Sequence, residues 1–337
     1  MNIRLLEFLC DPLDKSELTL TDAAWDADGR VMSGLLVSQA GRRYPIRDGI
    51  PRFIAADDSL GNSVASFGDE WNHFNFDDFK VNWLTHTVAN TFGRVAAFEK
   101  KVVVDCGAGS GMQSRWIADA GARHVIALEL SHSVDDVMQR NLRGVANVDI
   151  VQCSIDQPPI KSNSIDGIVI CHNVIQHTSS VERTAHALWE LVGPGGEFAF
   201  NCYPKNDRGL IRKLRLAWYS LLRAVLSRLS FGSLLVYARI LSVLRFIPIL
   251  GWFLEKSGFM VRGDVPPGPA WVERAYKSGV LNTYDCYGSH SFQHLKTDEE
   301  IRALVAELQP DSRRVLNADR YFQRPQPIGI ALRLLRG

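Results

Sequence analysis

Residues 101–130 read KVVVDCGAGSGMQSRWIADAGARHVIALEL, and this stretch decides the fold. The run Val102–Val104 is apolar without polar alternation, as expected of a strand that is covered on both faces. Gly107, Gly109 and Gly111 follow at alternate positions, where the backbone can bend sharply and approach a ligand closely. The stretch therefore predicts the first strand of a parallel sheet, followed by a ligand-binding loop.

A helix and a second strand follow the glycines. Met112 to Ala120 is expected to be helical, and His124 to Leu128 is a β-favouring run that leads into the acid Glu129. A carboxylate at the end of that strand can accept hydrogen bonds from both hydroxyls of a ribose. We therefore expect a β-loop-α-β unit that holds a nucleoside, and a turn without a nucleotide is the less favoured alternative.

The spacing of the glycines argues against two nucleotide-binding motifs. A dinucleotide fingerprint needs a glycine where this chain has Met112, and a phosphate loop needs Lys and Ser/Thr where Met112 and Gln113 stand. A nicotinamide-dependent oxidoreductase is therefore disfavoured.

The pattern that remains is D-x-G-x-G-x-G, from Asp105 to Gly111. Together with VIQHTSSVERTAHALWELVGPGGEFAF at 174–200, it resembles the class I S-adenosylmethionine-dependent methyltransferases of type 11/12. The resemblance implies S-adenosyl-L-methionine as cofactor, with its aminoacyl part on the glycine loop and its ribose on the acid. The implied cofactor-binding residues are Asp105, Gly107, Ala108, Gly109, Glu129, Leu130, Ser154, Ile155 and Cys171. The family often has Asp where this chain has Ser154, so Asp156 is the alternative partner for the adenine amine.

Later segments supply the remaining strands. We expect strands at Val148–Gln152, Ser164–Ile170, Glu197–Asn201, Arg314–Asn317 and Ile328–Leu334. The resemblance implies an α/β fold with a doubly wound seven-stranded sheet in the order 3-2-1-4-5-7-6, whose last strand is antiparallel. It carries a small N-terminal β-rich domain and a helical insertion.

Helix starts are marked by two capping boxes. Ser179-x-x-Glu182 and Thr297-x-x-Glu300 each place a hydroxyl three residues before a glutamate. We expect helices that run from these boxes to Val192 and to Leu308.

The first 58 residues form a separate small unit. The phrases CDPLDKSEL and GRRYPIRDGIPRFI resemble a zinc-ribbon-like domain that activates certain methyltransferases and in which four cysteines can hold zinc. This chain keeps only Cys10, with Asp14 and Gly41-Arg42 at the other positions. We expect the ribbon fold without metal, in a scaffold role.

The methyltransferase domain is expected at 59–204 and 297–337, with a helical insertion at 205–296. Its lead-in contains Trp71, which we interpret as a core residue, with a place beside the cofactor as the alternative. From Arg208 to Leu254 the insertion has no acid and several arginines.

One expected helix of the insertion has an apolar face. This face consists of Leu210, Leu214, Ala217, Leu221, Val225 and Leu229. The favoured interpretation is a helix packed on its own domain with solvated arginines. The alternatives are peripheral membrane contact through 208–254 and a cover for a lipophilic substrate. The uncharged runs are too short to span a bilayer.

Composition limits the partners. A net charge of +1 over 337 residues gives no reason to expect nucleic acid. Six dispersed cysteines in an otherwise ordinary composition fit a reducing cytoplasm, and the apolar start is too short for a signal peptide. We expect a cytoplasmic protein, with a membrane-peripheral location as an extension of that expectation.

Candidates for the acceptor site lie in LNTYDCYGSHSFQHLKT, 281–297. Our catalytic candidates are His290, His294 and Tyr287, as base or hydrogen-bond partner of the acceptor; His172 and His177 are further candidate bases. The two histidines of the segment are four apart and could bind a metal on a helix, but no third ligand follows and a strand-to-loop setting is expected. We therefore predict no metal site.

The sequence thus predicts methyl transfer to a small-molecule acceptor: a biosynthetic intermediate, a glycan or a lipophilic compound. The alternative is a cofactor-bound, non-catalytic regulatory or scaffold subunit that docks through its basic helices.

Overall fold

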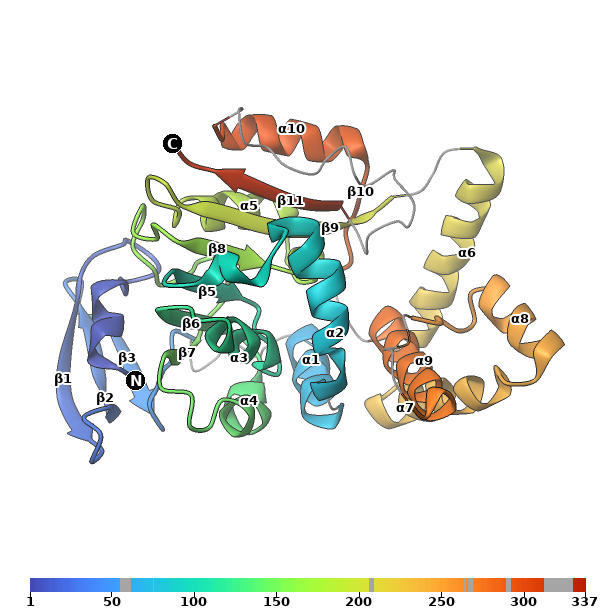
Figure 1. The fold of residues 1–337 in the computed structure, drawn as a ribbon, viewed down its shortest axis with the longest axis horizontal. Coiled ribbons are helices and arrows are strands. Elements are labelled where there is room, and N and C mark those ends of the chain that lie inside the picture. Colours follow the sequence, from blue (N-terminus) through green and yellow to red (C-terminus); the bar gives the residue numbers. More distant parts are fainter. Residues whose placement is uncertain are drawn as a thin grey trace. The chain divides into compact units, whose positions relative to one another are not determined.

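The computed structural model describes residues 1–54, 62–74, 76–205, 209–263, 265, 269–288, 292–311 and 330–337. The chain divides into two compact units (Figure 1). The sheet unit comprises Met1–Ser59, Trp83–Pro204 and Phe292–Gly337, and the helical unit comprises Leu60–Asn82 and Lys205–Ser291. Residues 60–82, which the sequence assigned to the methyltransferase domain, therefore group with the insertion.

The sheet unit is built on one large sheet of mostly parallel strands (Figure 1). Its strands are β5 (Val102–Cys106), β6 (His124–Glu129), β7 (Val148–Gln152), β8 (Ile168–Cys171), β9 (Glu197–Pro204), β10 (Leu295–Lys296) and β11 (Ile330–Leu335). Their order is β10-β9-β8-β5-β6-β7, and β11 pairs with β9 in the antiparallel sense. The predicted doubly wound fold with an antiparallel last strand is confirmed, while the strand expected at Arg314–Asn317 lies outside the described residues.

Helices cover this sheet. They include α3 (Met112–Asp119), α4 (Val137–Asn141), α5 (Val181–Trp189) and α10 (Asp298–Leu308). Helix α3 contacts β5, β6 and β7, whereas α5 contacts α10. The 3-10 helices η4 (Val95–Phe98), η5 (His132–Asp135) and η6 (Ile175–His177) and the π-helical η3 (Trp83–Phe92) complete the unit.

One of the two expected capping boxes is confirmed. Thr297 caps α10 together with Glu300, as predicted. At α5 the prediction was one residue early, because Ser180 is the N-cap and accepts from the Arg183 amide. The hydroxyl of Ser179 instead donates to Asp156 Oδ2 at 2.9 Å.

A four-stranded antiparallel sheet precedes the large one and belongs to the same unit. Its strands are β1 (Leu18–Trp25), β2 (Val31–Ser38), β3 (Arg43–Arg47) and β4 (Ile50–Pro51), after the short 3-10 helix η1 (Ile3–Glu7). Buried Leu5, Leu36 and Ile46 belong to the same hydrophobic cluster as Val104 of β5 and Phe198 of β9. The two sheets therefore share one core.

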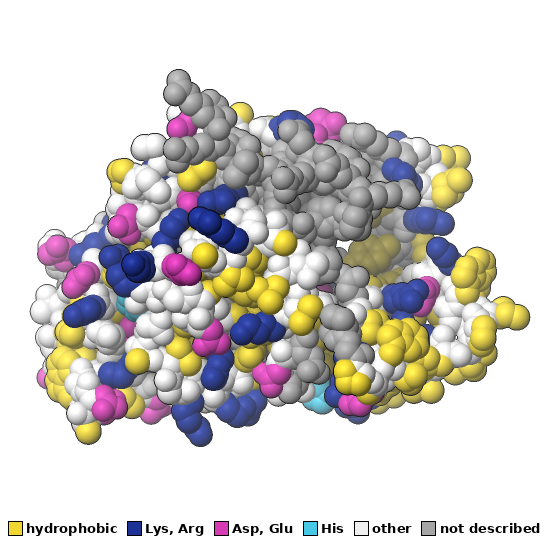
Figure 2. Space-filling model, viewed as in Figure 1, with side chains coloured by type: hydrophobic (Ala, Val, Ile, Leu, Met, Phe, Trp, Pro, Cys, Tyr) yellow, Lys and Arg dark blue, Asp and Glu magenta, His cyan; other side chains and the backbone are white. Residues whose placement is uncertain are grey.

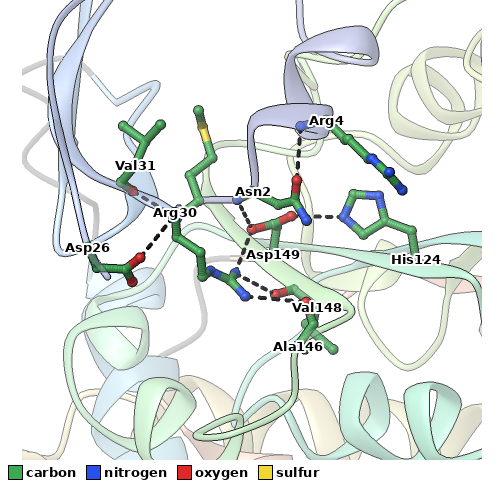
Figure 3. Close-up of polar contacts among 10 residues, drawn as sticks. Asn2, Arg4, Asp26, Arg30, Val31, His124, Ala146, Val148 and Asp149 are labelled. Carbon is green, nitrogen blue, oxygen red and sulfur yellow. Dashed lines mark hydrogen bonds and ion pairs between the residues drawn. The ribbon is translucent and has the colours of Figure 1, made fainter. Parts of the chain in front are cut away.

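Polar contacts around Asp149 of β7 also join the two sheets (Figure 3). Its carboxylate accepts from the Asn2 backbone amide at 2.7 Å and from Arg30 Nη2 at 2.9 Å. The His124 ring Nε2 lies 2.9 Å from the other carboxylate oxygen. This buried carboxylate is therefore held from both sheets.

The arginine of the ribbon-like phrase forms an ion pair where the resemblance places metal ligands. Arg42 Nε donates to Asp11 Oδ2 at 2.7 Å and its Nη2 pairs with Asp14. Among the residues that the structure describes, no three His, Cys, Asp or Glu side chains gather in a metal-binding arrangement.

The helical unit has its own hydrophobic core. Its helices are α1 (Asn62–His73), α2 (Lys80–Asn82), α6 (Leu210–Leu226), α7 (Phe231–Leu244), α8 (Pro248–Lys256) and α9 (Trp271–Tyr287), with the 3-10 helix η2 (Asp77–Phe79). Tyr284 and Tyr287 are fully buried against Leu226 and Leu234. Residues 281–287 form the end of α9, whereas His294 lies outside any helix, directly before β10.

The solvent exposure of Trp71 and of α6 tests two of the sequence-based expectations. The Trp71 ring is half-buried and packs on Phe76, with 4.9 Å between ring centroids. The apolar face expected to pack is instead exposed over most of α6. No helix in the described ranges has the length and apolar content of a membrane-spanning segment.

Candidate cofactor site

The glycine loop after β5 turns back onto β6. The backbone amides of Gly107 and Ala108 both donate to the Leu128 carbonyl, at 2.8 and 2.9 Å. Gly107 has a φ of +77°, and a Cβ there would lie 2.5 Å from Val174 Cγ1. Only glycine fits this position, because a side chain would be strained and would meet Val174. The loop therefore has backbone rather than a side chain at this position, at the end of β5.

Glu129 ties the loop to the end of β6. One carboxylate oxygen accepts from the Gly109 amide and the other from the Ser131 amide, both at 2.8 Å. A carboxylate has about four lone-pair positions, so both oxygens can still accept from a diol. The residue is 7 % exposed. The sequence-based expectation of a ribose-binding acid is compatible with this geometry.

Asp105 lies at the end of β5 and is fully buried. Gln113 Nε2 donates to Oδ1 at 2.7 Å and Ser114 Oγ donates to Oδ2 at 2.6 Å. Burial raises the pKa of this carboxyl to about 6, against the effect of the two donors. Its contacts connect the strand to the first turn of α3, so it shapes the loop.

The other expected cofactor residues follow the strand ends. Leu130 comes directly after β6, Ser154 and Ile155 follow β7, and Cys171 ends β8. Burial raises the pKa of the Cys171 thiol well above its usual value. The thiol is therefore neutral and behaves as a small apolar side chain. Ile155 is 8 % exposed and supplies another apolar surface.

Asp156, the alternative partner for the adenine amine, already accepts hydrogen bonds from other residues. The carboxylate of Asp156 accepts from Ser179 at 2.9 Å and from the Thr184 hydroxyl, both at the start of α5. Ser154 Oγ accepts from the Asp156 amide at 3.2 Å. This arrangement leaves Ser154 better placed than Asp156 to meet a ligand.

Sequence reasoning missed three amide side chains, which lie after β8, in η6 and in β9. Asn173 has a φ of +60° and exchanges two hydrogen bonds with the buried Asn201, at 2.6 and 2.7 Å. Gln176 of η6 is fully buried, and in the described part of the chain neither end of its amide has a hydrogen-bond partner. An unpaired buried amide costs stability, so it calls for a ligand or another explanation. The position of Gln176 directly after the apolar Val174 and Ile175 could have indicated a buried amide.

The catalytic candidates fall in different parts of the chain. His294 belongs to the sheet unit: its backbone amide donates to the Gln176 carbonyl at 2.8 Å, and its Nε2 lies 3.1 Å from the Thr178 carbonyl. Tyr287 belongs to the core of the helical unit, and its hydroxyl donates to the Gly258 carbonyl. His290 lies outside the described residues.

The two further histidines are also in the sheet unit. The ring of His172 lies 3.4 Å from the Thr87 hydroxyl. His177 Nδ1 lies 3.2 Å from the Phe292 carbonyl, and its ring meets Tyr203 edge-on.

Comparison with known proteins agrees with this geometry. Residues 104–200 match the family model described as methyltransferase domain. This part of the chain is therefore similar to methyltransferase domains. The expected enzyme class and its cofactor, S-adenosylmethionine, are confirmed at the level of this domain.

Relatives with curated names cover less than half of the chain. The ubiquinone biosynthesis O-methyltransferase of Salmonella newport is 25% identical over 143 residues, 42% of this chain and 56% of that protein. Its counterpart from Aromatoleum aromaticum is 30% identical over 119 residues, 35% of this chain and 50% of that protein. The chain thus spans about half the length of these relatives.

Two solved structures are also similar to this chain over a larger share of its length. An O-methyltransferase family protein from Burkholderia thailandensis has a TM-score of 0.44 and 12% identity, and covers 79% of this chain and 59% of its own. An S-adenosylmethionine-dependent methyltransferase from Mesorhizobium loti has a TM-score of 0.41 and 14% identity, and covers 71% and 93%.

Proposed function

We propose that this protein transfers the methyl group of S-adenosylmethionine to a hydroxyl of a small-molecule acceptor. The observation that carries the proposal is the pair of hydrogen bonds from the Gly109 and Ser131 amides to Glu129, which fixes a buried carboxylate beside the backbone of the glycine loop. The relatives above are named O-methyltransferases, which favours oxygen as the acceptor atom.

The chemistry requires few protein groups. The cofactor supplies a methyl on a sulfonium, and the methyl moves to the acceptor oxygen while its bonding electron pair stays on sulfur. Alignment of the two atoms and exclusion of water are the contributions of the protein. A hydroxyl acceptor also loses a proton, so a base near the acceptor accelerates the reaction.

His294 is the best-supported base. Its Nε2 faces the Thr178 carbonyl at 3.1 Å, so a neutral ring carries its proton on that nitrogen and its lone pair on Nδ1. Its backbone amide is anchored to Gln176 of η6, directly after the strand end that lines the cofactor site. A base that is held in position by hydrogen bonds favours a catalytic protein over a non-catalytic scaffold subunit. Tyr287 is less suited to this role, because its hydroxyl already donates to Gly258.

The cofactor test uses S-adenosylhomocysteine and the whole chain. A ligand at 100 times its dissociation constant stabilises the folded state by about 2.7 kcal/mol, which appears as a rise in melting temperature. We expect this rise for the wild type and for Asp166→Ala, which replaces an exposed acid just before β8, and not for Glu129→Ala. Equal rises in all three proteins would refute the proposed site. Turnover is then tested with labelled cofactor and cell extract, comparing wild type with His294→Ala.

We also propose that residues 1–58 are a scaffold with a ribbon-like fold that needs no zinc. The ion pairs of Arg42 with Asp11 and Asp14 support this, because a cation side chain already joins the two loops that metal ligands would join. Atomic absorption of the purified protein should find less than one zinc per ten chains. A chelator that lowers the melting temperature would contradict the proposal.

We further propose that the protein is cytoplasmic and that it contacts an anionic membrane surface through 208–254. The apolar face of α6 supports this: Leu210, Leu214, Leu221 and Val225 are 73, 61, 57 and 57 % exposed. Figure 2 shows hydrophobic side chains beside basic ones over the helical unit. Apolar groups beside arginines suit a surface of anionic headgroups.

Liposome flotation tests this contact. We expect the protein to float with phosphatidylglycerol vesicles and not with phosphatidylcholine vesicles, and Leu214→Ser/Leu221→Ser to lose flotation. Leu13→Ser is the matched control, because Leu13 is 63 % exposed but lies in the sheet unit. Flotation that is unchanged in the double variant would exclude the α6 face.

A further inference from the structure

The helical unit contains a cavity of about 430 Å³. Its walls come from α1, η2, α7 and α9, all within this unit. The volume is within the range of about 300 to 1,000 Å³ that small-molecule sites occupy. The cavity is therefore large enough for a ligand, and it involves none of the residues of the cofactor site.

The charged groups that line the cavity are all basic. They are Arg239 of α7 and Arg274 and Lys277 of α9, and no carboxylate lines the cavity in the described ranges. Lys277 forms an exposed ion pair with Glu273 at 2.7 Å, which neutralises part of its charge. Arg274 donates from Nη1 to the Pro269 carbonyl, and together with Arg239 it keeps the lining of the cavity basic.

Arg239 is held at the cavity by a neighbouring imidazole. Its Nη2 lies 3.3 Å from Nε2 of His73, another lining residue. Burial, and then the nearby arginine, lower the pKa of His73, so the ring is neutral near pH 7 and can accept the hydrogen bond of the guanidinium. The imidazole orients this cation without competing for an anion.

The rest of the lining is apolar and aromatic. Phe74, Phe79 and Tyr276 contribute rings, and Val280 and Leu281 contribute aliphatic surface. The Phe74 ring is fixed from behind by the buried Tyr284, with 5.9 Å between centroids. Rings that are held in place form a stacking surface for a flat or extended apolar group.

We propose that this cavity binds an amphiphilic anion, in which a carboxylate, sulfonate or phosphate is carried on an aromatic or alkyl body. The anionic group pairs with Arg239 and Arg274, whose planar forks suit oxyanions, and the body lies against Phe74, Phe79 and Tyr276. A soluble aromatic acid and an anionic lipid headgroup share this chemistry. Binding here does not depend on the methyl-transfer proposal.

The test is calorimetric titration of the whole protein without cofactor. The probes are naphthalene-2-sulfonate, its neutral counterpart 2-naphthol, and inorganic sulfate. We expect naphthalene-2-sulfonate to bind at least tenfold more tightly than either of the others, because only it offers both the charge and the rings. Equal affinity for 2-naphthol and naphthalene-2-sulfonate, or no binding of the latter, overturns the proposal.

Matched arginine variants locate the binding. Arg239→Gln should weaken naphthalene-2-sulfonate binding at least fivefold, whereas Arg215→Gln, an exposed arginine of α6 that does not line the cavity, should change it less than twofold. Equal losses would indicate non-specific attraction and refute the site. If Arg239→Gln fails to fold, as judged by its melting curve, Lys277→Gln replaces it with the same expected direction.

Vesicle competition separates the two sources of the anion. If the natural ligand is a lipid headgroup, naphthalene-2-sulfonate will displace the protein from phosphatidylglycerol vesicles and Arg239→Gln will float poorly. If it is a soluble acid, neither will affect flotation while the calorimetric result stands. Both outcomes support the cavity as a binding site.

Discussion

Arg52 donates from Nη1 to Gln152 Oε1 at 2.6 Å, and this bond links the small N-terminal sheet to the end of β7. The other guanidinium branch donates to Asp135 Oδ1, also at 2.6 Å. Arg52 is 9 % exposed and its bond to Gln152 is buried, whereas the Asp135 side chain is 51 % exposed. Charge-assisted hydrogen bonds of this kind are stronger than neutral ones.

The link continues into the cofactor loop. Gln152 Nε2 lies 3.3 Å from the Leu130 carbonyl and 3.4 Å from the Ser131 carbonyl. The Ser131 amide is in turn one of the two donors to Glu129. The N-terminal sheet is therefore connected through two side chains to the acid expected to bind the ribose.

We predict that Arg52→Ala raises the dissociation constant for S-adenosylhomocysteine about tenfold, a loss of about 1.4 kcal/mol. The variant leaves Gln152 without its donor, so the Leu130–Ser131 backbone loses its support. Calorimetric titration measures the change. Arg43→Ala, an exposed arginine of β3, is the control and should bind like wild type. Normal affinity in Arg52→Ala would mean that the link has no bearing on the cofactor.

Gly107 and Gly144 provide a second, closely matched test. Both have a left-handed φ, +77° and +76°, but a Cβ at Gly107 would lie 2.5 Å from Val174 Cγ1, whereas one at Gly144 would have nothing within 4 Å. Gly144→Ala should lose only the backbone term, about 1 kcal/mol. Gly107→Ala should also displace the loop and abolish the thermal shift with S-adenosylhomocysteine.

A double variant separates the two effects at Gly107. Gly107→Ala/Val174→Ala removes the Val174 methyl groups that the new Cβ would meet, and should recover part of the cofactor affinity. If Gly144→Ala abolished cofactor binding as well, backbone strain alone would explain the loss and the close approach to Val174 would be irrelevant.

Local patterns were sufficient to predict the centre of the sheet unit. The strand at Val148–Gln152 has the predicted bounds, and the glycines and Glu129 lie at consecutive strand ends as expected. These features depend on residues near each other in sequence: an unbroken apolar run, glycines at a turn and a carboxylate directly after a strand. The parallel order then brings the strand ends to one edge of the sheet.

Long-range contacts decided what the sequence could not predict. Ser179 and Ser180 are equally good N-caps by type, and the choice depends on Asp156, which binds Ser179 from another strand end. The spacing of Leu214 and Leu221 correctly predicted that they share one face of a helix. Spacing alone does not predict whether another element covers that face.

Replacing Gln176 by methionine is expected to stabilise the ligand-free protein. Its buried amide has no partner in the described ranges, and leaving such a group unpaired costs about 1 to 3 kcal/mol. Methionine has a similar volume without the polar atoms, so urea unfolding should show a higher free energy of unfolding. The rise in melting temperature with S-adenosylhomocysteine should be smaller, because the variant lacks the Gln176 amide that is expected to hydrogen-bond the ligand.

Gln113→Met is the matched control, because it removes an amide that does have hydrogen-bond partners. The Gln113 amide donates to Asp105 at 2.7 Å and accepts from Trp83 Nε1 at 3.0 Å. Its loss should lower the free energy of unfolding by about 1 to 3 kcal/mol. If both variants were destabilised alike, Gln176 would have a structural partner and would not be held for a ligand.

The helical unit contains one buried and one half-buried carboxyl group that make its stability depend on pH. Glu70 of α1 is 2 % exposed, and its Oε2 has no hydrogen-bond partner within the described segments. Burial, and then the nearby Asp285, raise the pKa of Glu70 well above its usual value. Burial raises the pKa of Asp285 of α9 to about 6.

The sign of the pH effect follows from these directions. In the unfolded chain both acids ionise near pH 4, at about 3.9 and 4.3, whereas in the folded protein they hold their protons to higher pH. The stability they contribute is therefore fully present below pH 4 and is lost as the pH rises through 6 and beyond. Glu70→Gln cannot ionise, so its melting temperature should exceed that of the wild type at pH 8 and should fall less between pH 5 and 8.

Calorimetric melting at pH 5, 6, 7 and 8 measures this difference. Glu273→Gln is the control in the same unit, because Glu273 is exposed and Lys277 lowers its pKa. Its melting temperature should follow the pH dependence of the wild type over this range. A Glu70→Gln variant whose melting temperature falls between pH 5 and 8 as steeply as that of the wild type would show that Glu70 is already ionised in the folded protein, and that a basic group compensates its charge.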